Sequence, residues 1–126
     1  MKNSLKQLVV FPLALGLMLV PGCSKSSSGP VTLAPEQIPT AMNEGFKQSS
    51  PEARELAGNC ASATQNQDVT TAFADLQKLS RRNDLTPEQR SIAARAMATT
   101  MVQLRAASEN GNPQAQAVLR QYLSTR

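Results

Sequence analysis

Residues 68–79 read Asp-Val-Thr-Thr-Ala-Phe-Ala-Asp-Leu-Gln-Lys-Leu, and this stretch decides the fold class. Its apolar side chains recur at the three- and four-residue spacing of one helix face, and they are Val69, Ala72, Phe73, Leu76 and Leu79. Asp68 stands directly before them, where a short side-chain oxygen can cap the first amide groups of a helix. The stretch therefore predicts an amphipathic α-helix that buries one face.

Two further helices are expected before this stretch. Ile38, Met42 and Phe46 repeat every four residues around Pro39, which suits a first helical turn. Ser50 is a typical N-cap for a second helix that begins directly after it. The side chains expected on the inward face of that second helix are Ala53, Leu56, Ala57, Cys60 and Thr64.

Two more helices are expected after the stretch. The run Thr86-Pro87-Glu88-Gln89 combines a threonine cap, a proline in the first turn and a glutamine at the third position, which together form a capping box. The helix that it opens is expected to end near Ser108, and Gly111 suits the left-handed turn that follows. Asn112 then caps a last helix. The inward-facing side chains expected in these two helices are Ala93, Ala96, Met97, Thr100, Met101, Leu104, Ala115, Val118, Leu119 and Tyr122.

The composition supports a helical fold. No segment shows the sustained two-residue alternation of β-branched residues that a sheet would need. Aromatic residues make up only 3% of the 126 residues, so the core must be built largely from aliphatic and alanine side chains. We predict an all-α fold, a small bundle of about five short antiparallel helices over residues 38–126.

Residues 68–88 resemble the second helix of a tetratricopeptide repeat, with Ala72, Leu76 and Leu79 followed by a proline that opens the next helix. The resemblance implies tetratricopeptide-like helical hairpins. The Trp-Leu-Gly-Tyr pattern of the repeat's first helix is absent, and Pro87 lies a few residues late. A generic bundle of helical hairpins is therefore the preferred alternative.

The first 22 residues have the three parts of an export signal peptide. Lys2 and Lys6 supply a positive start, residues 8–20 form an uncharged and mostly apolar run, and Gly22 is a small residue before a cysteine. The apolar run has 13 residues, fewer than the ~20 that a helix needs to cross a bilayer. A removable signal is therefore favoured over a permanent transmembrane anchor.

The stretch Leu19-Val20-Pro21-Gly22-Cys23 resembles the lipobox of bacterial lipoproteins. Val20 and Gly22 match its aliphatic and small positions, whereas Pro21 departs from the usual choice. The resemblance implies that Cys23 receives a diacylglycerol thioether, that the signal is cut between Gly22 and Cys23, and that the new amine gains an acyl chain such as palmitate. Ser24 then implies sorting to the periplasmic face of the outer membrane. An ordinary signal peptide is the alternative, although no Ala-x-Ala cleavage site lies nearby.

The chain is thus expected to have three parts. Residues 1–22 are the signal, residues 23–37 are the lipidated cysteine and a flexible Ser/Pro/Gly tether, and residues 38–126 are the helical domain. Taken whole, the part after the signal also resembles small helical bacterial lipoproteins that share a segment like Leu85-Thr-Pro-Glu-Gln89. That resemblance implies no activity.

Lipidation of Cys23 would leave Cys60 without a partner for a disulfide. The residues around Cys60 at helical spacing are small or apolar, so a small buried side chain is expected there. No Cys-x-x-Cys motif and no histidine is present to activate this thiol.

The charge of the chain does not predict nucleic-acid binding. The formal net charge is +4, but Lys2 and Lys6 would leave with the signal, so 11 cationic residues would face nine anionic ones. Arg81 and Arg82 form the only adjacent basic pair after the signal, and few aromatic side chains are available for bases to stack on.

The sequence also lacks the usual groups for catalysis. There is no histidine, the cysteines are not clustered for a metal, and the six glycines form no phosphate loop. The carboxylates weighed for sugar hydrolysis are Glu52, Glu55, Asp75 and Glu88, and each has an ordinary place in a helix first turn or on a face expected to be wet. Ser62, Ser91 and Ser108 have only Lys78 as a candidate base. We predict no enzymatic activity, no metal, no cofactor beyond the acyl groups and no small-molecule substrate, and the binding residues stay unassigned.

Three functions follow in order of preference. The first is a membrane-anchored interaction domain that docks an envelope protein in a groove between helices. The second is a structural or lipid-surface role, in which Arg81, Arg82, Arg90 and Arg95 contact anionic headgroups. The third is a cell-wall hydrolase that uses the carboxylates named above.

Overall fold

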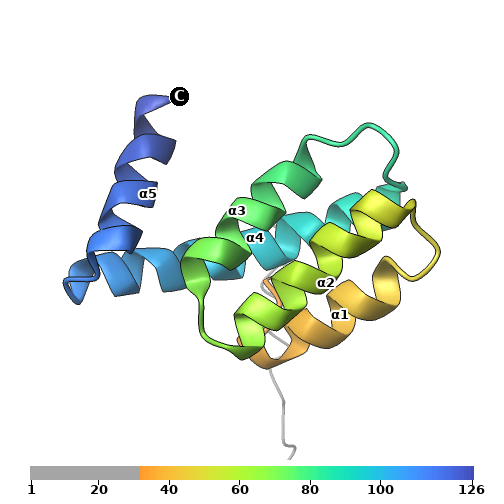
Figure 1. The fold of residues 1–126 in the computed structure, drawn as a ribbon, viewed down its shortest axis with the longest axis horizontal. Helices are drawn as coiled ribbons and strands as arrows, with labels where there is room; N and C mark the ends of the chain where they lie inside the picture. Colours follow the sequence, from red (N-terminus) through yellow and green to blue (C-terminus); the bar gives the residue numbers. More distant parts are fainter. Residues whose placement is uncertain (1–31) are drawn as a thin grey trace, which may run out of the picture.

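The structure is a computed structural model that describes residues 32–126, and this part of the chain is built from five α-helices and one short 3-10 helix (Figure 1). In chain order these are η1 (Pro35–Gln37), α1 (Ile38–Gly45), α2 (Pro51–Gln65), α3 (Val69–Ser80), α4 (Pro87–Glu109) and α5 (Pro113–Ser124). No strand occurs among the described residues, so the predicted all-α fold is confirmed.

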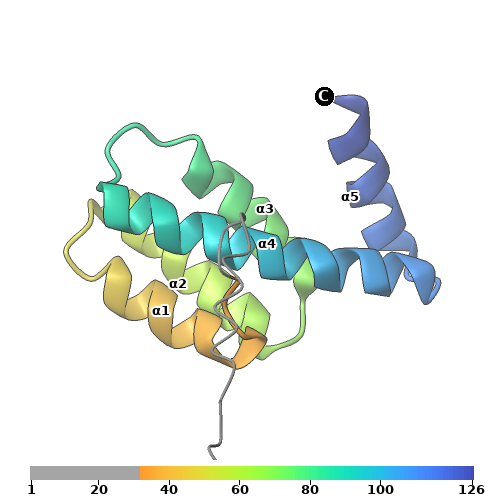
Figure 2. The ribbon, with the colours of Figure 1, turned by 180° about the vertical axis from the view of Figure 1, so that it is seen from behind.

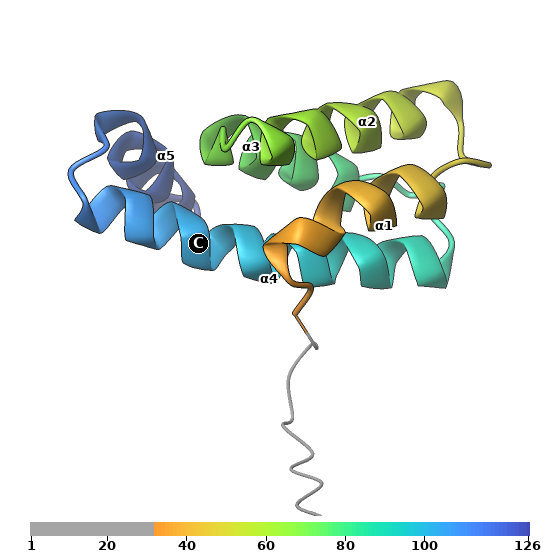
Figure 3. The same ribbon diagram turned by 90° about the horizontal axis from the view of Figure 1, so that it is seen from below.

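Helices α1 to α4 form a closed unit of two layers. Helices α1 and α4 make one layer, and α2 and α3 make the other (Figure 3). Each helix contacts the next along the chain, and α1 also packs on α4. A Cβ atom built on Gly45 would lie 2.5 Å from Cδ1 of Ile92, so the end of α1 approaches α4 closely because this position has no side chain.

Helix α5 stands apart from this unit. It packs against α4 and the start of α3 and crosses α4 steeply, rising away from the other helices (Figures 1 and 2). The expectation of antiparallel pairs therefore fails for the last helix. The reason lies in helix length, because α4 has 23 residues whereas α1 has eight, α2 has 15 and α3 has 12. The C-terminal half of α4 extends beyond its neighbours, and α5 covers Met101 and Leu104 there.

The core consists of two apolar clusters. The first joins α1 to α4 and includes Ile38, Met42, Phe46 and Leu76, all fully buried. The second lies where α3, α4 and α5 meet; Phe73, Leu104 and Ala115 are buried there among seven partly buried apolar side chains. Every side chain that the sequence placed on an inward face is buried or half-buried.

The packed part of the chain begins earlier than residue 38. Leu33 is buried in the first cluster, and its carbonyl oxygen accepts a hydrogen bond from Oγ1 of Thr99 in α4. The first described residues therefore lie against α4 near its middle (Figure 2). The C-terminal end of the expected tether over residues 23–37 is therefore packed, and the sequence did not indicate this because Leu33 lies in a stretch without helical periodicity.

The four helix starts that the sequence indicated are confirmed. Ser50, Asp68 and Asn112 each accept a hydrogen bond from the amide three residues later, at 3.4, 3.1 and 3.0 Å. Thr86 and Gln89 form the capping box reciprocally, at 3.1 and 3.0 Å. The left-handed Gly111, with a φ of 88°, turns the chain between α4 and α5.

Gln89 has a second role that the sequence did not reveal. Its side chain is buried, and its Nε2 atom donates to the Gly45 carbonyl at 3.2 Å and to the Ser49 hydroxyl at 2.7 Å. The capping box at the start of α4 therefore also holds the loop that joins α1 to α2.

We expect Thr86→Ala to lower the free energy of unfolding by about 1–2 kcal/mol, since it removes the cap and loosens the buried Gln89. Chemical denaturation measures this loss. Ser91→Ala, at an exposed position of the same helix, is the control and should change stability by less than about 0.5 kcal/mol. Equal effects of the two substitutions would contradict the role assigned to the capping box.

Candidate functional site

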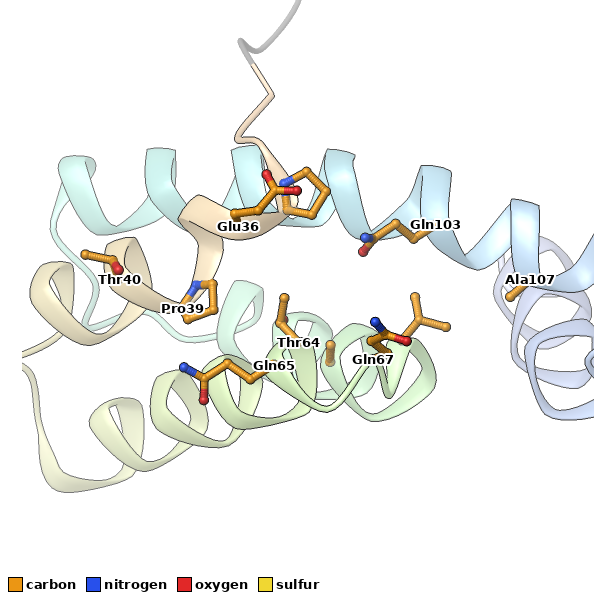
Figure 4. A pocket seen from close by; sticks show the side chains of 11 residues that line it. Glu36, Pro39, Thr40, Thr64, Gln65, Gln67, Gln103 and Ala107 are labelled. Atoms are coloured by element: carbon orange, nitrogen blue, oxygen red, sulfur yellow. The ribbon is translucent and has the colours of Figure 1, made fainter.

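A groove of about 680 Å³ opens between the start of the helical unit, the turn from α2 to α3, and α4 (Figure 4). Gln103 lies on α4 along one side, while Thr64 and Gln67 lie on the other side, at the end of α2 and in the turn after it. Apolar side chains such as Pro39 and Val69 line the groove between these polar groups. The groove thus combines apolar surface with amide and hydroxyl groups.

The turn that carries Gln67 has an unusual backbone. Gln67 has a φ of 58°, the only positive φ of a non-glycine residue in the described chain. Helix α2 ends there with two hydrogen bonds, from the Asp68 amide to the Ala63 carbonyl at 2.8 Å and from the Gln67 amide to the Thr64 carbonyl at 3.2 Å. Glycine is the usual residue at such a helix end, and a longer side chain costs about 1 kcal/mol or more in this conformation. The chain therefore keeps a strained glutamine at the edge of the groove.

The groove is almost uncharged. Glu36 is the one ionisable residue among those that line it. The side-chain amides of Gln65, Gln67 and Gln103 each offer both donors and an acceptor. This set of groups suits a neutral polar ligand, such as a peptide backbone, better than an anion.

Comparisons with protein-family models, with curated proteins and with solved structures found no match.

A second polar cluster joins the start of α2 to the loop between α3 and α4. The Arg82 guanidinium contacts Asp84 at 2.7 Å and Glu52 at 3.1 Å, and it donates to the Ser50 hydroxyl at 3.3 Å. Arg90 donates to two carbonyl groups of the same loop. Arg82 and Arg90, two of the four arginines considered for a lipid surface, thus hold this loop. Glu52, which was considered for sugar hydrolysis, forms an ion pair with Arg82.

The hydrogen bond from Arg82 lowers the pKa of Asp84 from 3.8 to about 2. A carboxyl group whose pKa is lowered by folding stabilises the folded state at pH values above its ordinary pKa. This stabilisation is lost as the pH falls through the pKa of the group in the folded protein. We therefore expect unfolding to become easier between about pH 4 and pH 2, and Asp84→Asn to remove part of that dependence. Denaturation at a series of pH values measures it. Glu55→Gln, at an exposed carboxylate, is the control and should leave this part of the curve unchanged.

The four carboxylates weighed for catalysis have different surroundings. Glu52, Glu55 and Glu88 are exposed, whereas Asp75 is only 6% exposed. The expectation that Asp75 lies on a wet face is therefore wrong. It lies at the edge of the apolar stripe of α3, and the approach of α2 covers that edge. Lys78, the candidate base for a serine, pairs with Asp75 at 3.5 Å.

Cys60 is fully buried between the helices of the first cluster, as its surroundings in the sequence indicated. Loss of solvation raises the pKa of its thiol from 9.0 to about 11, and the nearby Asp75 carboxylate adds to this effect. The thiol is therefore neutral and poorly reactive at physiological pH.

A thiol whose pKa is raised by folding favours the folded state at pH values below its ordinary pKa. This contribution is lost as the pH rises through the pKa of the thiol in the folded protein. We expect stability to fall by about 2–3 kcal/mol between about pH 9 and pH 11 because of Cys60. Cys60→Ala should lack this component, and the difference between the two pH profiles isolates it. Parallel profiles would contradict the burial of the thiol.

The proposed lipidation residues, Gly22 and Cys23, lie outside the described residues. Between residues 32 and 126, no helix is both long enough and apolar enough to cross a bilayer. In the same part of the chain, no three His, Cys, Asp or Glu side chains are grouped to hold a metal ion.

Proposed function

We propose that this chain is an exported lipoprotein, held to the envelope membrane by acyl chains on Cys23, and that its helical domain docks a segment of a partner protein. We place it at the periplasmic face of the outer membrane. The lipobox supports the anchor, and the groove beside α4 supports the docking. The observation that carries the docking function is the strained Gln67 at the edge of that groove.

The groove fits an extended peptide segment. Its glutamine side chains can pair with backbone N–H and C=O groups, and its apolar surface can receive the side chains between them. Backbone strain costs stability and persists where the surroundings or a function require it. A glycine at position 67 would relieve the strain but would remove one amide from the groove.

The start of the domain supports a short connection to the membrane. Eight residues separate Cys23 from Thr32, and fully extended they span at most about 30 Å. The chain is then fixed to α4 through Leu33, and Glu36 at the edge of the groove follows three residues later. A partner in the same membrane, or close to it, is therefore within reach of the groove.

Site-specific photocrosslinking in the cell tests this proposal. A photoreactive amino acid at Gln103, at native expression, should give a discrete adduct with another protein, which mass spectrometry identifies. The same group at the exposed Arg54, on α2 and outside the groove lining, is the matched control and should give no such adduct. Recovery of the monomer alone from both positions would overturn the docking function.

Gln67→Gly provides a second, independent test. We expect this variant to be more stable by about 0.5–1 kcal/mol, because glycine adopts the left-handed conformation at little cost. The yield of the Gln103 crosslink should nevertheless fall at least several-fold. A stabilised variant that crosslinks as well as the wild type would show that the side chain of Gln67 serves no partner.

A further inference from the structure

The chain joins the helical unit on the outer side of the layer that α1 and α4 form. Leu33 is buried there, and its carbonyl oxygen accepts the hydrogen bond from Thr99 of α4. The first described residues project from this layer on the side away from α2 and α3 (Figure 3). An anchor that precedes them in the chain is therefore connected to the α1–α4 layer, and α2 and α3 form the far side of the unit.

The outer face of α4 lies beside this attachment. Its residues recur at the spacing of one helix face, and they are Arg95, Ala98, Val102 and Arg105. Val102 and Arg105 are exposed, and the other two are half-buried. Val102 is 64% exposed, the highest value for a large apolar side chain in residues 32–126. It lies within one helical turn of Thr99, which holds the start of the domain.

The charges of the domain are unevenly distributed along the chain. Residues 32–86 carry five cationic and seven anionic side chains, a net charge of −2. Residues 87–126, which include α4 and α5, carry five arginines and two glutamates, a net charge of +3. Both glutamates lie at the ends of α4, Glu88 in its first turn and Glu109 as its last residue. All the ionisable side chains in the middle of α4 are therefore cationic.

We infer that the outer face of α4 contacts the anionic surface of the bilayer to which the chain is anchored, an inference that rests on the proposed lipid anchor at Cys23. An anionic membrane surface attracts arginine side chains over a distance of about 10 Å. The guanidinium group of Arg105 can pair with a lipid phosphate, while its aliphatic part and Val102 lie at the level of the headgroups. A neutral surface would not use these charges.

The anchor makes such a contact effective. One valine and two arginines offer little binding energy to a protein that is free in solution. The eight residues between Cys23 and Thr32 span at most about 30 Å, so they hold the face close to the membrane at an effective concentration of about 1 mM or more. Gln103, which lines the groove, follows Val102 at about 100° around the helix. The groove would then open along the membrane surface, within reach of a partner in the same membrane.

Fluorescence quenching on the full-length lipidated protein tests this orientation. The protein is reconstituted into vesicles of phosphatidylethanolamine with about one quarter phosphatidylglycerol. A bimane label is attached to Val102→Cys, and the acylated Cys23 and the buried Cys60 should not react with it. We expect a nitroxide on the lipid headgroup to quench this label strongly, and iodide in the water to quench it weakly.

The matched control is the same label on Arg54→Cys. Arg54 is exposed on α2, in the layer that would lie about 10 Å further from the bilayer. Its label should be quenched by iodide and at least about threefold less by the lipid nitroxide. Equal lipid quenching at the two positions would overturn the inference. A label at position 102 that neither quencher reaches would also overturn it, because a second copy of the chain would then cover this face.

Charge and attachment are tested separately. Arg105→Glu should lower the lipid quenching at position 102 by at least about twofold, whereas Arg54→Glu should leave it unchanged. Vesicles of phosphatidylcholine alone should lower it similarly for the unchanged chain, and quenching that responds to neither change would contradict the electrostatic contact. Flotation of the vesicles measures the anchor itself. A chain that does not float refutes the proposed anchor, whereas a chain that floats with equally quenched labels refutes only the orientation.

Discussion

Replacing Phe73 with alanine is expected to destabilise the domain by about 3–5 kcal/mol, the largest loss that we predict for a single core side chain. Phe73 is fully buried where α3, α4 and α5 meet. Its ring also packs edge-to-face on Tyr122 of α5, with centroids 5.4 Å apart and planes at 85°. The substitution therefore opens a cavity and removes a ring contact between α3 and α5.

The size of this effect matters because the domain is small. Domains of this kind are commonly stable by about 5–15 kcal/mol, so the loss would lower the midpoint of thermal unfolding by roughly 15 °C or more. Thermal and chemical unfolding measure it. Val102→Ala is the matched control, since Val102 is 64% exposed on α4 and should cost less than about 0.5 kcal/mol. A loss below about 1 kcal/mol for Phe73→Ala would mean that α5 does not dock as described.

Replacing Cys23 with serine is expected to abolish lipid attachment completely. Three acyl chains hold a protein at a bilayer firmly, because each buried methylene contributes about 0.8 kcal/mol, whereas serine offers no thiol for the thioether. Metabolic labelling with an alkyne fatty acid should mark the wild-type chain and leave Cys23→Ser unmarked. Intact mass should show the wild type without residues 1–22 and with the added acyl groups.

The second cysteine provides the matched control for this experiment. Cys60→Ala should be labelled as strongly as the wild type, because Cys60 is buried in the helical unit. Counting thiols adds a check on the native protein. With Cys23 acylated, we expect no reactive thiol in the folded protein and one after unfolding, whereas a second thiol, or label on the Cys23→Ser chain, would contradict the anchor.

Much of the fold could be predicted because the signals are local. A cap such as Thr86 with Gln89 joins residues only three apart, so it acts before any tertiary contact forms. The apolar stripe from Val69 to Leu79 likewise marks the inward face of α3 without reference to other helices. The proposed export signal and lipobox also depend on adjacent residues, and they stay predictions.

The features of the candidate sites could not be predicted in this way. The left-handed conformation of Gln67 has no signal, because glutamine is not a residue that favours such a turn. Asp75 lies beside the apolar stripe in sequence, and only the approach of α2 decides that it is buried. The groove beside α4 could not be located before the helices were placed.

By itself, the sequence determined where the helices start and which faces they bury, because those properties depend on residues within a few positions of one another. Only the tertiary structure decided that Leu33 packs on α4, that α5 crosses α4 steeply and that Asp75 is buried. These depend on relative helix lengths and on contacts between residues such as Leu33 and Thr99, far apart in the chain. The free energy of such contacts is set by what each side chain meets in the folded state, and no local pattern contains that information.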